Sequence, residues 1–170
     1  MMDFQIRIAG IIEESIVDGP GIRLTVFAQG CPHHCPGCHN PETHSYEGGK
    51  SIPISEILKG LAMNPLLDGI TLSGGEPFAQ AEGFALLAQS AKQRGFHVMT
   101  YSGYTYEELT AQSKKEPAWA LLLEHTDLLV DGPFESANRN LLLPFRGSEN
   151  QRIIDVQASL KQGKVVLALA

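Results

Sequence analysis

The chain has 170 residues and a formal net charge of −6, and 43% of its residues are hydrophobic. That length suits one domain, 1–170, with a buried core, and an acidic balance without a basic stripe argues against nucleic-acid binding. No long apolar run is present and polar residues interrupt the first ten positions, so we expect neither a membrane span nor a signal peptide. Three closely spaced cysteines make no disulfide framework, which favours a reducing, cytoplasmic location.

Hydrophobic periodicity predicts an alternation of strands and helices along the chain. Apolar or alternating runs of about four to eight residues between turn-forming residues predict strands. Apolar residues that recur every three to four positions predict helices, one of which we expect Ser55 to cap and another of which we expect to end at Gly95. The predicted strands cover 5–12, 22–28, 70–72, 97–101 and 126–130, with 164–169 as a candidate final strand; the predicted helices cover 55–63, 80–94, 106–113 and 118–124.

This alternation is typical of parallel β/α units. A full eightfold barrel usually needs about 250 residues, so the expected fold is α/β, an open sheet or a partial (β/α) barrel in a single domain. In such folds the functional loops follow the carboxyl ends of the strands. Two polar segments, 73–76 and 131–132, lie at those positions, whereas 138–150 is expected to be irregular.

The three cysteines, Cys31, Cys35 and Cys38, have the spacing Cys-x3-Cys-x2-Cys. They belong to a segment rich in Pro and Gly, about 30–47, where regular structure is not expected. A loop of this length lets three sulfurs converge on one [4Fe–4S] cluster, which usually takes four protein ligands. Three thiolates would leave one iron open to an external ligand. The spacing therefore predicts a reactive iron–sulfur site.

Two other interpretations of the cysteines stay open. Three Cys and one His can hold a structural zinc ion, although zinc sites favour two separated ligand pairs. Unliganded buried cysteines are a second alternative, but this loop is too polar to be core. A zinc-stabilised binding module is therefore the alternative to an enzyme. The candidate fourth zinc ligands are His33, His34, His39 and His44.

Two motifs together, the cysteine triplet after one strand and Ser-Gly-Gly-Glu-Pro (73–77) after another, resemble the radical S-adenosylmethionine (SAM) superfamily. The match is closer to the glycyl-radical-enzyme activases and, among these, to the activating proteins of anaerobic ribonucleoside-triphosphate reductases. Gly37 stands where many radical SAM proteins have an aromatic residue, and the reductase activases share this glycine. The other matching segments are 18–23, 30–41, 127–134 and 145–152.

The resemblance implies that SAM fills the open iron position through its amino and carboxylate groups. The backbone at Gly74 and Gly75 would then reach the methionine part, and Glu76 would accept hydrogen bonds from the amino group. Taken without the resemblance, the same residues fit a tight turn with a surface glutamate.

The resemblance also implies that Gly37, Cys38 and His39 flank the adenine and ribose of SAM, and that Asp131 helps to order SAM through a cation. A solvated aspartate at a strand end is the alternative for Asp131. Other polar residues likewise have two interpretations, as partner or cofactor contacts or as parts of turns and loop networks. These are Asp18, Gly19 and Arg23 before the cysteine triplet, Thr100 and Ser102 at the rim of the site, and Arg146, Asn150 and Gln151 late in the chain; His33, His34 and His44 are expected to be solvated.

The activity implied by the resemblance is activation of another enzyme. The large subunit of an anaerobic ribonucleotide reductase would present a glycine-bearing loop, and a flavodoxin-like protein would supply the electron. Glycine suits this role because its Cα is not shielded by a side chain. The alternatives are an activase of another glycyl radical enzyme, such as pyruvate formate-lyase, and a small radical SAM enzyme that acts on a metabolite.

Overall fold

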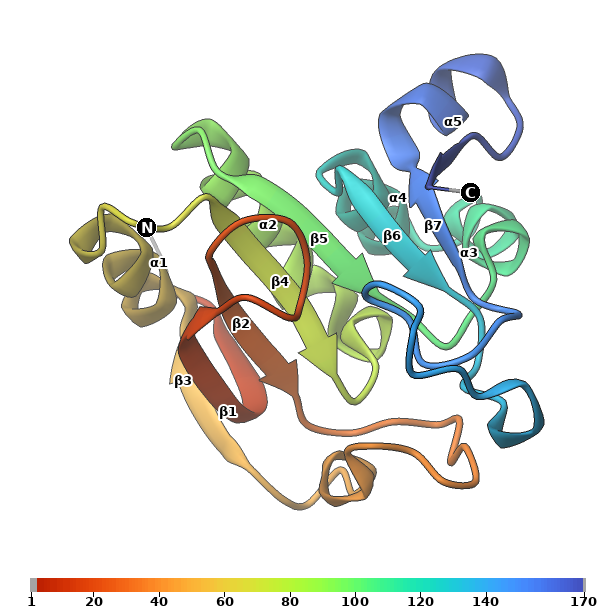
Figure 1. Cartoon of the computed structure of the whole chain (residues 1–170). Helices are drawn as coiled ribbons and strands as arrows, with labels where there is room; N and C mark the ends of the chain where they lie inside the picture. Colours follow the sequence, from red (N-terminus) through yellow and green to blue (C-terminus); the bar gives the residue numbers. More distant parts are fainter. Residues whose placement is uncertain (1–2, 170) are drawn as a thin grey trace.

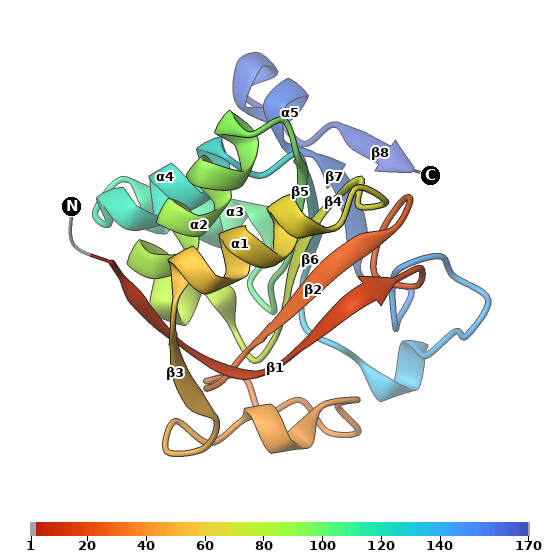
Figure 2. The same cartoon turned by 90° about the vertical axis from the view of Figure 1, so that its left-hand side faces the viewer.

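The structure, a computed structural model, describes residues 3–169. Its strands form one mixed sheet in the order β3-β1-β2-β4-β5-β6-β7-β8 (Figure 1; β8 is labelled in Figure 2). Strands β2, β4, β5 and β6 run parallel, and the outer strands add to them in antiparallel pairs. The strands are β1 (Gln5–Ser15), β2 (Arg23–Ala28), β3 (Lys50–Pro53), β4 (Gly69–Gly74), β5 (His97–Tyr101), β6 (Leu128–Asp131), β7 (Arg152–Asp155) and β8 (Leu167–Leu169).

Four helices, α1 to α4, cover one face of the sheet (Figure 2). The main core lies between the two layers, where Ile70 and Leu72 of β4 join Phe84 and Leu87 of α2 in one buried cluster. No helix within residues 3–169 combines the length and apolar composition that a membrane crossing needs. The helices are α1 (Ile54–Met63), α2 (Ala81–Gln93), α3 (Tyr106–Ser113), α4 (Pro117–Glu124) and α5 (Val156–Gln162).

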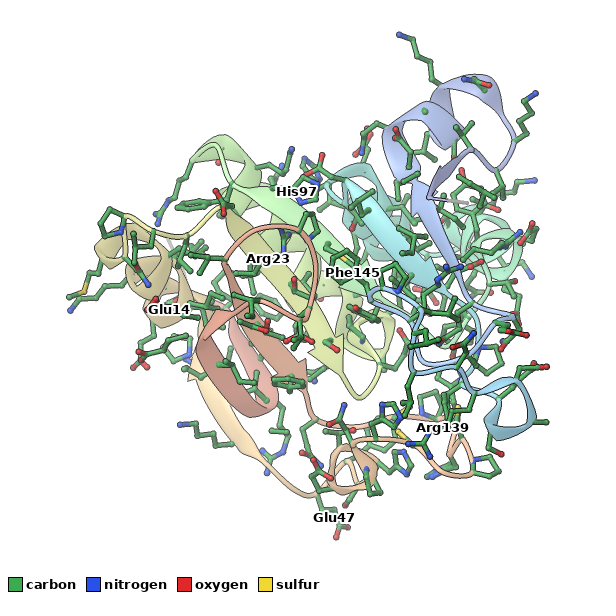
Figure 3. The ribbon with its side chains drawn as sticks, viewed as in Figure 1. Glu14, Arg23, Glu47, His97, Arg139 and Phe145 are labelled. Atoms are coloured by element: carbon green, nitrogen blue, oxygen red, sulfur yellow. The ribbon has the colours of Figure 1, made fainter. Side chains whose placement is uncertain are left out.

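The opposite face of the sheet carries the loop 16–22, which connects β1 to β2 and lies over the amino half of the parallel strands (Figure 3). Its backbone packs closely on the sheet: the hydroxyl of Thr71 donates to the carbonyl of Asp18 at 2.6 Å. Gly19 has φ +133, and a Cβ there would lie 2.7 Å from the sulfur of Met99. The loop therefore closes this end of the face and leaves the carboxyl ends of the strands open.

Arg23, at the start of β2, holds this closed end together. Its guanidinium is fully buried and donates to the Thr71 hydroxyl (2.7 Å) and to the carbonyls of Pro20 and Ile70 (both 2.9 Å). Its Nη2 also lies 3.0 Å from Nδ1 of His97, and Figure 3 labels both side chains. Burial lowers the pKa of Arg23 to about 10, so the group stays charged at neutral pH.

The structure confirms the predicted α/β class but shows a mixed sheet. Helix α1 begins at Ile54, so the prediction that Ser55 caps it was wrong; Ser55 lies inside the helix and donates to Asp3. Three elements were missed: β3, β7 and α5. The two strands have four residues each, too few for periodicity to reveal. Helix α5 begins where the Asp155 side chain accepts from the Ala158 N–H at 3.0 Å.

Candidate functional site

A cavity of about 510 Å³ lies at the carboxyl ends of the parallel strands. Two segments border it (Figure 1): the cysteine loop, 30–47, in orange, and the late loop, 132–151, in blue. Cys31, Cys35 and Cys38 all line this cavity, together with the glycines that end β4. The structure thus brings the two motifs of the sequence to one place.

Hydrogen bonds close the cysteine loop at its base. The N–H of Gly30 donates to the carbonyl of Thr43 at 2.7 Å, and the N–H of Cys31 donates to the carbonyl of His44 at 3.2 Å. The buried side-chain amide of Gln29 donates to two further loop carbonyls. The segment is therefore a compact Ω loop whose two ends meet beside the end of β2.

The three cysteines differ in their surroundings. Cys31 is buried, and this burial raises the pKa of its thiol. Cys35 and Cys38 are half-buried, and the sulfur of Cys38 accepts from the N–H of Asn40 at 3.4 Å. Residues 3–169 contain no three Cys, His, Asp or Glu side chains close enough to form a ready metal cage, so the thiols line the cavity separately.

The cavity wall nevertheless fits an iron–sulfur cluster and a polar ligand. Thiolates are the usual protein ligands of such clusters. Two side-chain nitrogens, Nε2 of His44 and Nε of Arg146, are buried and have no hydrogen-bond partner within the described residues, and both residues line the cavity. Buried polar atoms are almost always paired in native proteins. These two atoms therefore mark a cavity suited to a polar ligand.

Gly74 and Gly75 bring the end of β4 close to β2 and to the cysteine loop. Gly74 has φ +86, and a Cβ there would lie 2.5 Å from the nitrogen of Ala28. A Cβ on Gly75 would lie 2.3 Å from the carbonyl oxygen of Gly30. Both positions line the cavity, and the Gly75 N–H is already used by the Ala28 carbonyl at 2.7 Å. Glycine is required here for close packing; contact with SAM stays a prediction.

Glu76 is fully buried, and the lining of the cavity does not include it. Its carboxylate accepts from the Ser102 hydroxyl (3.0 Å) and from the backbone N–H groups of Gly103 (2.8 Å) and Phe78 (3.1 Å). It also lies 2.6 Å from Nε2 of His33. The expectation that His33 is solvated was therefore wrong, and the predicted contact of Glu76 with SAM has no free oxygen turned toward the cavity to support it.

Asp131 is also buried, at 1% exposure, and it faces α3 instead of the cavity. It accepts from Nη2 of Arg152 at 2.5 Å and from the Tyr106 N–H at 2.7 Å. Arg152 bonds Glu107 as well, and this hydrogen bond lowers the pKa of the Glu107 carboxyl. Asp131 is thus no solvated strand end, and the structure brings its neighbour Gly132 to the cavity in its place.

The late loop is held by its own hydrogen bonds. Gln151 accepts from the N–H groups of Gly147 (2.9 Å) and Ser148 (3.2 Å) and donates to the carbonyl of Gly132 (3.1 Å). These bonds favour the loop-network interpretation of Gln151. Phe134 contacts the cysteine loop: its ring lies 5.1 Å from that of His39. The same ring lies 3.5 Å from where a Cβ on Gly37 would stand.

Other predicted positions divide between the two ends of the sheet. Asp18 lines the cavity, and its carboxylate accepts from the Ser15 hydroxyl at 2.5 Å. Arg23 contacts no residue of the cysteine loop in the described chain, and the Thr100 hydroxyl is buried against that of Thr126 at 2.9 Å. The sequence interpretation missed three positions of the site: His33, Gly103 and Phe134. A signal was present for Gly103, because Ser102-Gly103 directly follows β5 and Ser73-Gly74 ends β4.

Comparison with known proteins agrees with this geometry. A family model described as a 4Fe-4S single cluster domain matches residues 17–154. The anaerobic ribonucleoside-triphosphate reductase-activating proteins of Escherichia coli K12 and Pasteurella multocida are each 33% identical to the chain, over 80% and 81% of it and 90% of their own length. A pyruvate formate-lyase-activating enzyme of Clostridium pasteurianum is 38% identical over 73% of the chain, which spans half of that relative. The chain therefore belongs to the 4Fe-4S single cluster domain family and, within it, to the glycyl-radical-enzyme activases.

Proposed function

We propose that the chain is a radical SAM enzyme that activates an anaerobic ribonucleoside-triphosphate reductase by forming a glycyl radical on its large subunit. One observation carries the proposal: Cys31, Cys35 and Cys38 line a single cavity with Gly74 and Gly75. The relatives named for this activation support it, because the chain spans 90% of their length. The finer description of the fold as a partial (β/α) barrel of the radical SAM type belongs to the same proposal.

In this proposal the chain's own residues hold and shield the reacting groups. The three thiolates hold the cluster, and the backbone at Gly74 and Gly75 borders the methionine part of SAM. Gly37, Cys38 and His39 border the nucleoside part. When bound, the cluster and SAM would supply reductive cleavage of a carbon–sulfur bond of SAM, with one electron from the donor protein, and so the means to take a hydrogen atom from a glycine Cα. The cavity that would hold the cluster lies between the cysteine loop and the late loop, so a partner that covers its mouth would exclude water.

The mouth of the cavity suits a protein substrate. Val17 and Leu143 line the cavity, and exposed apolar side chains adjoin both in sequence: Ile16 precedes Val17 in the loop on the sheet, and Leu141 and Leu142 precede Leu143 in the late loop. Leu142 is 92% exposed. Several large apolar side chains exposed together are characteristic of interaction sites. A flavodoxin-like donor and a cytoplasmic, oxygen-poor environment complete the proposal.

The direct test is anaerobic reconstitution with iron and sulfide, followed by reduction in the presence of SAM. We expect 5′-deoxyadenosine and methionine, and an electron-spin signal of a glycyl radical once the large reductase subunit is added. A sample that takes up zinc, binds no sulfide and leaves SAM intact would support the zinc-stabilised module and overturn the proposal.

The 38% identity to a pyruvate formate-lyase-activating enzyme favours a second candidate partner. The two candidates separate when each glycyl radical enzyme is offered to the same reconstituted sample. We expect the radical signal with the reductase, because the chain spans only half of the lyase-activating relative but nearly all of the reductase-activating relatives. A signal with the lyase alone would reassign the partner and leave the chemistry unchanged.

A further inference from the structure

We propose that His33 is a positioning residue: its ring fits a socket at the ends of β4 and β5 and thereby fixes the first half of the cysteine loop. The His33 socket consists of Glu76, Gly103 and Tyr104. The inference rests on the proposed function only in taking Cys31 and Cys35, the two residues that flank His33, as cluster ligands.

Glu76 supplies the polar wall of the socket. Its carboxylate is fully buried, and Oε1 lies 2.6 Å from Nε2 of His33. The other hydrogen bonds to this carboxylate come from the Ser102 hydroxyl and from the N–H groups of Gly103 and Phe78. All three are fixed by the ends of β5 and β4, so the carboxylate has one orientation. Hydrogen bonds to such a buried ionisable group are among the stronger ones in proteins.

Gly103 supplies the room for the ring. A Cβ at this position would lie 2.4 Å from Cδ2 and 2.7 Å from Cγ of His33. The backbone of Gly103 does not adopt the left-handed conformation that would itself require glycine. Glycine is therefore needed at position 103 to leave room for the ring of His33, and not to allow an unusual backbone conformation. This close fit is independent of the hydrogen bond to Glu76.

Tyr104 closes the remaining side. Its ring meets that of His33 edge-on at 4.4 Å and rests in turn on the ring of Trp119 at 5.2 Å. Trp119 belongs to α4 and packs against the main core. A residue in the middle of an otherwise polar loop is thus connected to the core of the domain through two aromatic contacts.

The two halves of the cysteine loop are held in different ways. His33 fixes the part that contains Cys31 and Cys35 to the ends of two parallel strands. The part that contains Cys38 contacts Phe134 of the late loop instead.

The test uses the full chain without metal. In His33→Ala we expect amide hydrogen exchange in the segment 31–35 to rise at the Cys31 N–H, which donates to the His44 carbonyl, by roughly 10- to 100-fold, because an anchoring hydrogen bond and its packing are lost. The matched control is His34→Asn, since His34 is an exposed neighbour with φ +49 that Asn tolerates. The control should exchange like the wild type. Equal exchange in both variants would overturn the proposal.

A double-mutant cycle separates the socket from general destabilisation. Gly103→Ala should raise exchange in 31–35 as much as His33→Ala does, because the added methyl group displaces the ring. The same substitution placed in the His33→Ala background should add little, because the ring is gone. If Gly103→Ala has the same effect in both backgrounds, the two residues do not form a socket.

Metal uptake gives a second measurement. After anaerobic reconstitution, His33→Ala should bind less iron and sulfide than His34→Asn. The exchange cycle needs neither SAM nor the reductase, so its outcome is independent of the proposed activity. If the two substitutions are coupled in the exchange cycle but the protein does not cleave SAM, the His33 socket is supported and the proposed function is wrong. If the protein cleaves SAM but the two substitutions are not coupled, the proposed function is supported and the His33 socket is wrong.

Discussion

The two ends of the sheet face carry polar networks of opposite character. At the amino end, Arg23 is fully buried and its donors are taken by Thr71, by His97 and by backbone carbonyls. At the carboxyl end, His44 and Arg146 each keep a buried nitrogen without a partner within the described residues. A network whose hydrogen bonds are complete stabilises the fold, whereas one left incomplete around a cavity is available to a ligand.

This difference separates residues that look alike in the sequence. Arg23 and Arg146 both lie in segments that resemble the activases, yet only Arg146 lines the cavity. Glu76 lies just after β4 and Asp131 ends β6, so both lie at the carboxyl end; unlike His44 and Arg146, both belong to completed networks. Substitutions at the two ends should therefore affect stability and metal binding separately.

The largest expected effect is at the carboxyl end. Cys35→Ala should bind almost no iron and sulfide after anaerobic reconstitution, because two thiolates do not hold a cluster that usually takes four ligands. The thermal midpoint of the metal-free variant should stay close to that of the wild type, since Cys35 is only half-buried. Iron analysis and a thermal scan check both parts. A variant that keeps its cluster would contradict the assignment.

At the amino end we expect the opposite result, a loss of stability with iron binding retained. Arg23→Met removes the donors of a buried network and should cost about 3–5 kcal/mol of unfolding free energy. Urea unfolding measures this loss. The control is Arg94→Met, because Arg94 is exposed and a change within about 0.5 kcal/mol is expected there. Any folded Arg23→Met protein should still take up iron. A loss of iron binding without a loss of stability would show that the amino end also contributes to metal binding.

A substitution of Asp131 tests whether this buried carboxylate, which lies near the cavity, contributes to SAM binding. Asp131→Asn should lower the unfolding free energy by about 1–3 kcal/mol, because Arg152 loses its buried partner but remains partly exposed to water. SAM binding by the reconstituted variant should change little, since the carboxylate faces α3. A large loss of SAM affinity at unchanged stability would instead support the cation role that the resemblance implies.

The smallest effect is a pH dependence at the amino end. Nδ1 of His97 accepts from Arg23, and burial, together with the charge of Arg23, lowers the pKa of His97 below its ordinary 6.5. Its contribution to stability is therefore complete above pH 6.5 and is lost as the pH falls through the lowered pKa. Urea unfolding between pH 7 and pH 5 should show a steeper decline for the wild type than for His97→Gln. Parallel curves would mean that His97 titrates normally.

The sequence predicted the parts of the molecule that depend on local patterns. Periodicity identified most of the helices and the parallel strands, and the cysteine spacing pointed to a loop that lines the cavity. It failed where long-range contacts decide. His33 was expected to be solvated because nothing near it in sequence shows the socket formed 43 and more residues later. The partners of Glu76 and Asp131 likewise depend on register between strands, which a single sequence does not display.

The closed base of the Ω loop bears on how the protein would respond to exposure to oxygen. Because Gly30 and Cys31 bond across the base to Thr43 and His44, the segment that carries the sulfurs is closed by protein hydrogen bonds that need no metal. Oxidative loss of a bound [4Fe–4S] cluster should therefore leave the rest of the domain folded. We therefore expect the chain to take up iron and sulfide again after its cluster has been lost.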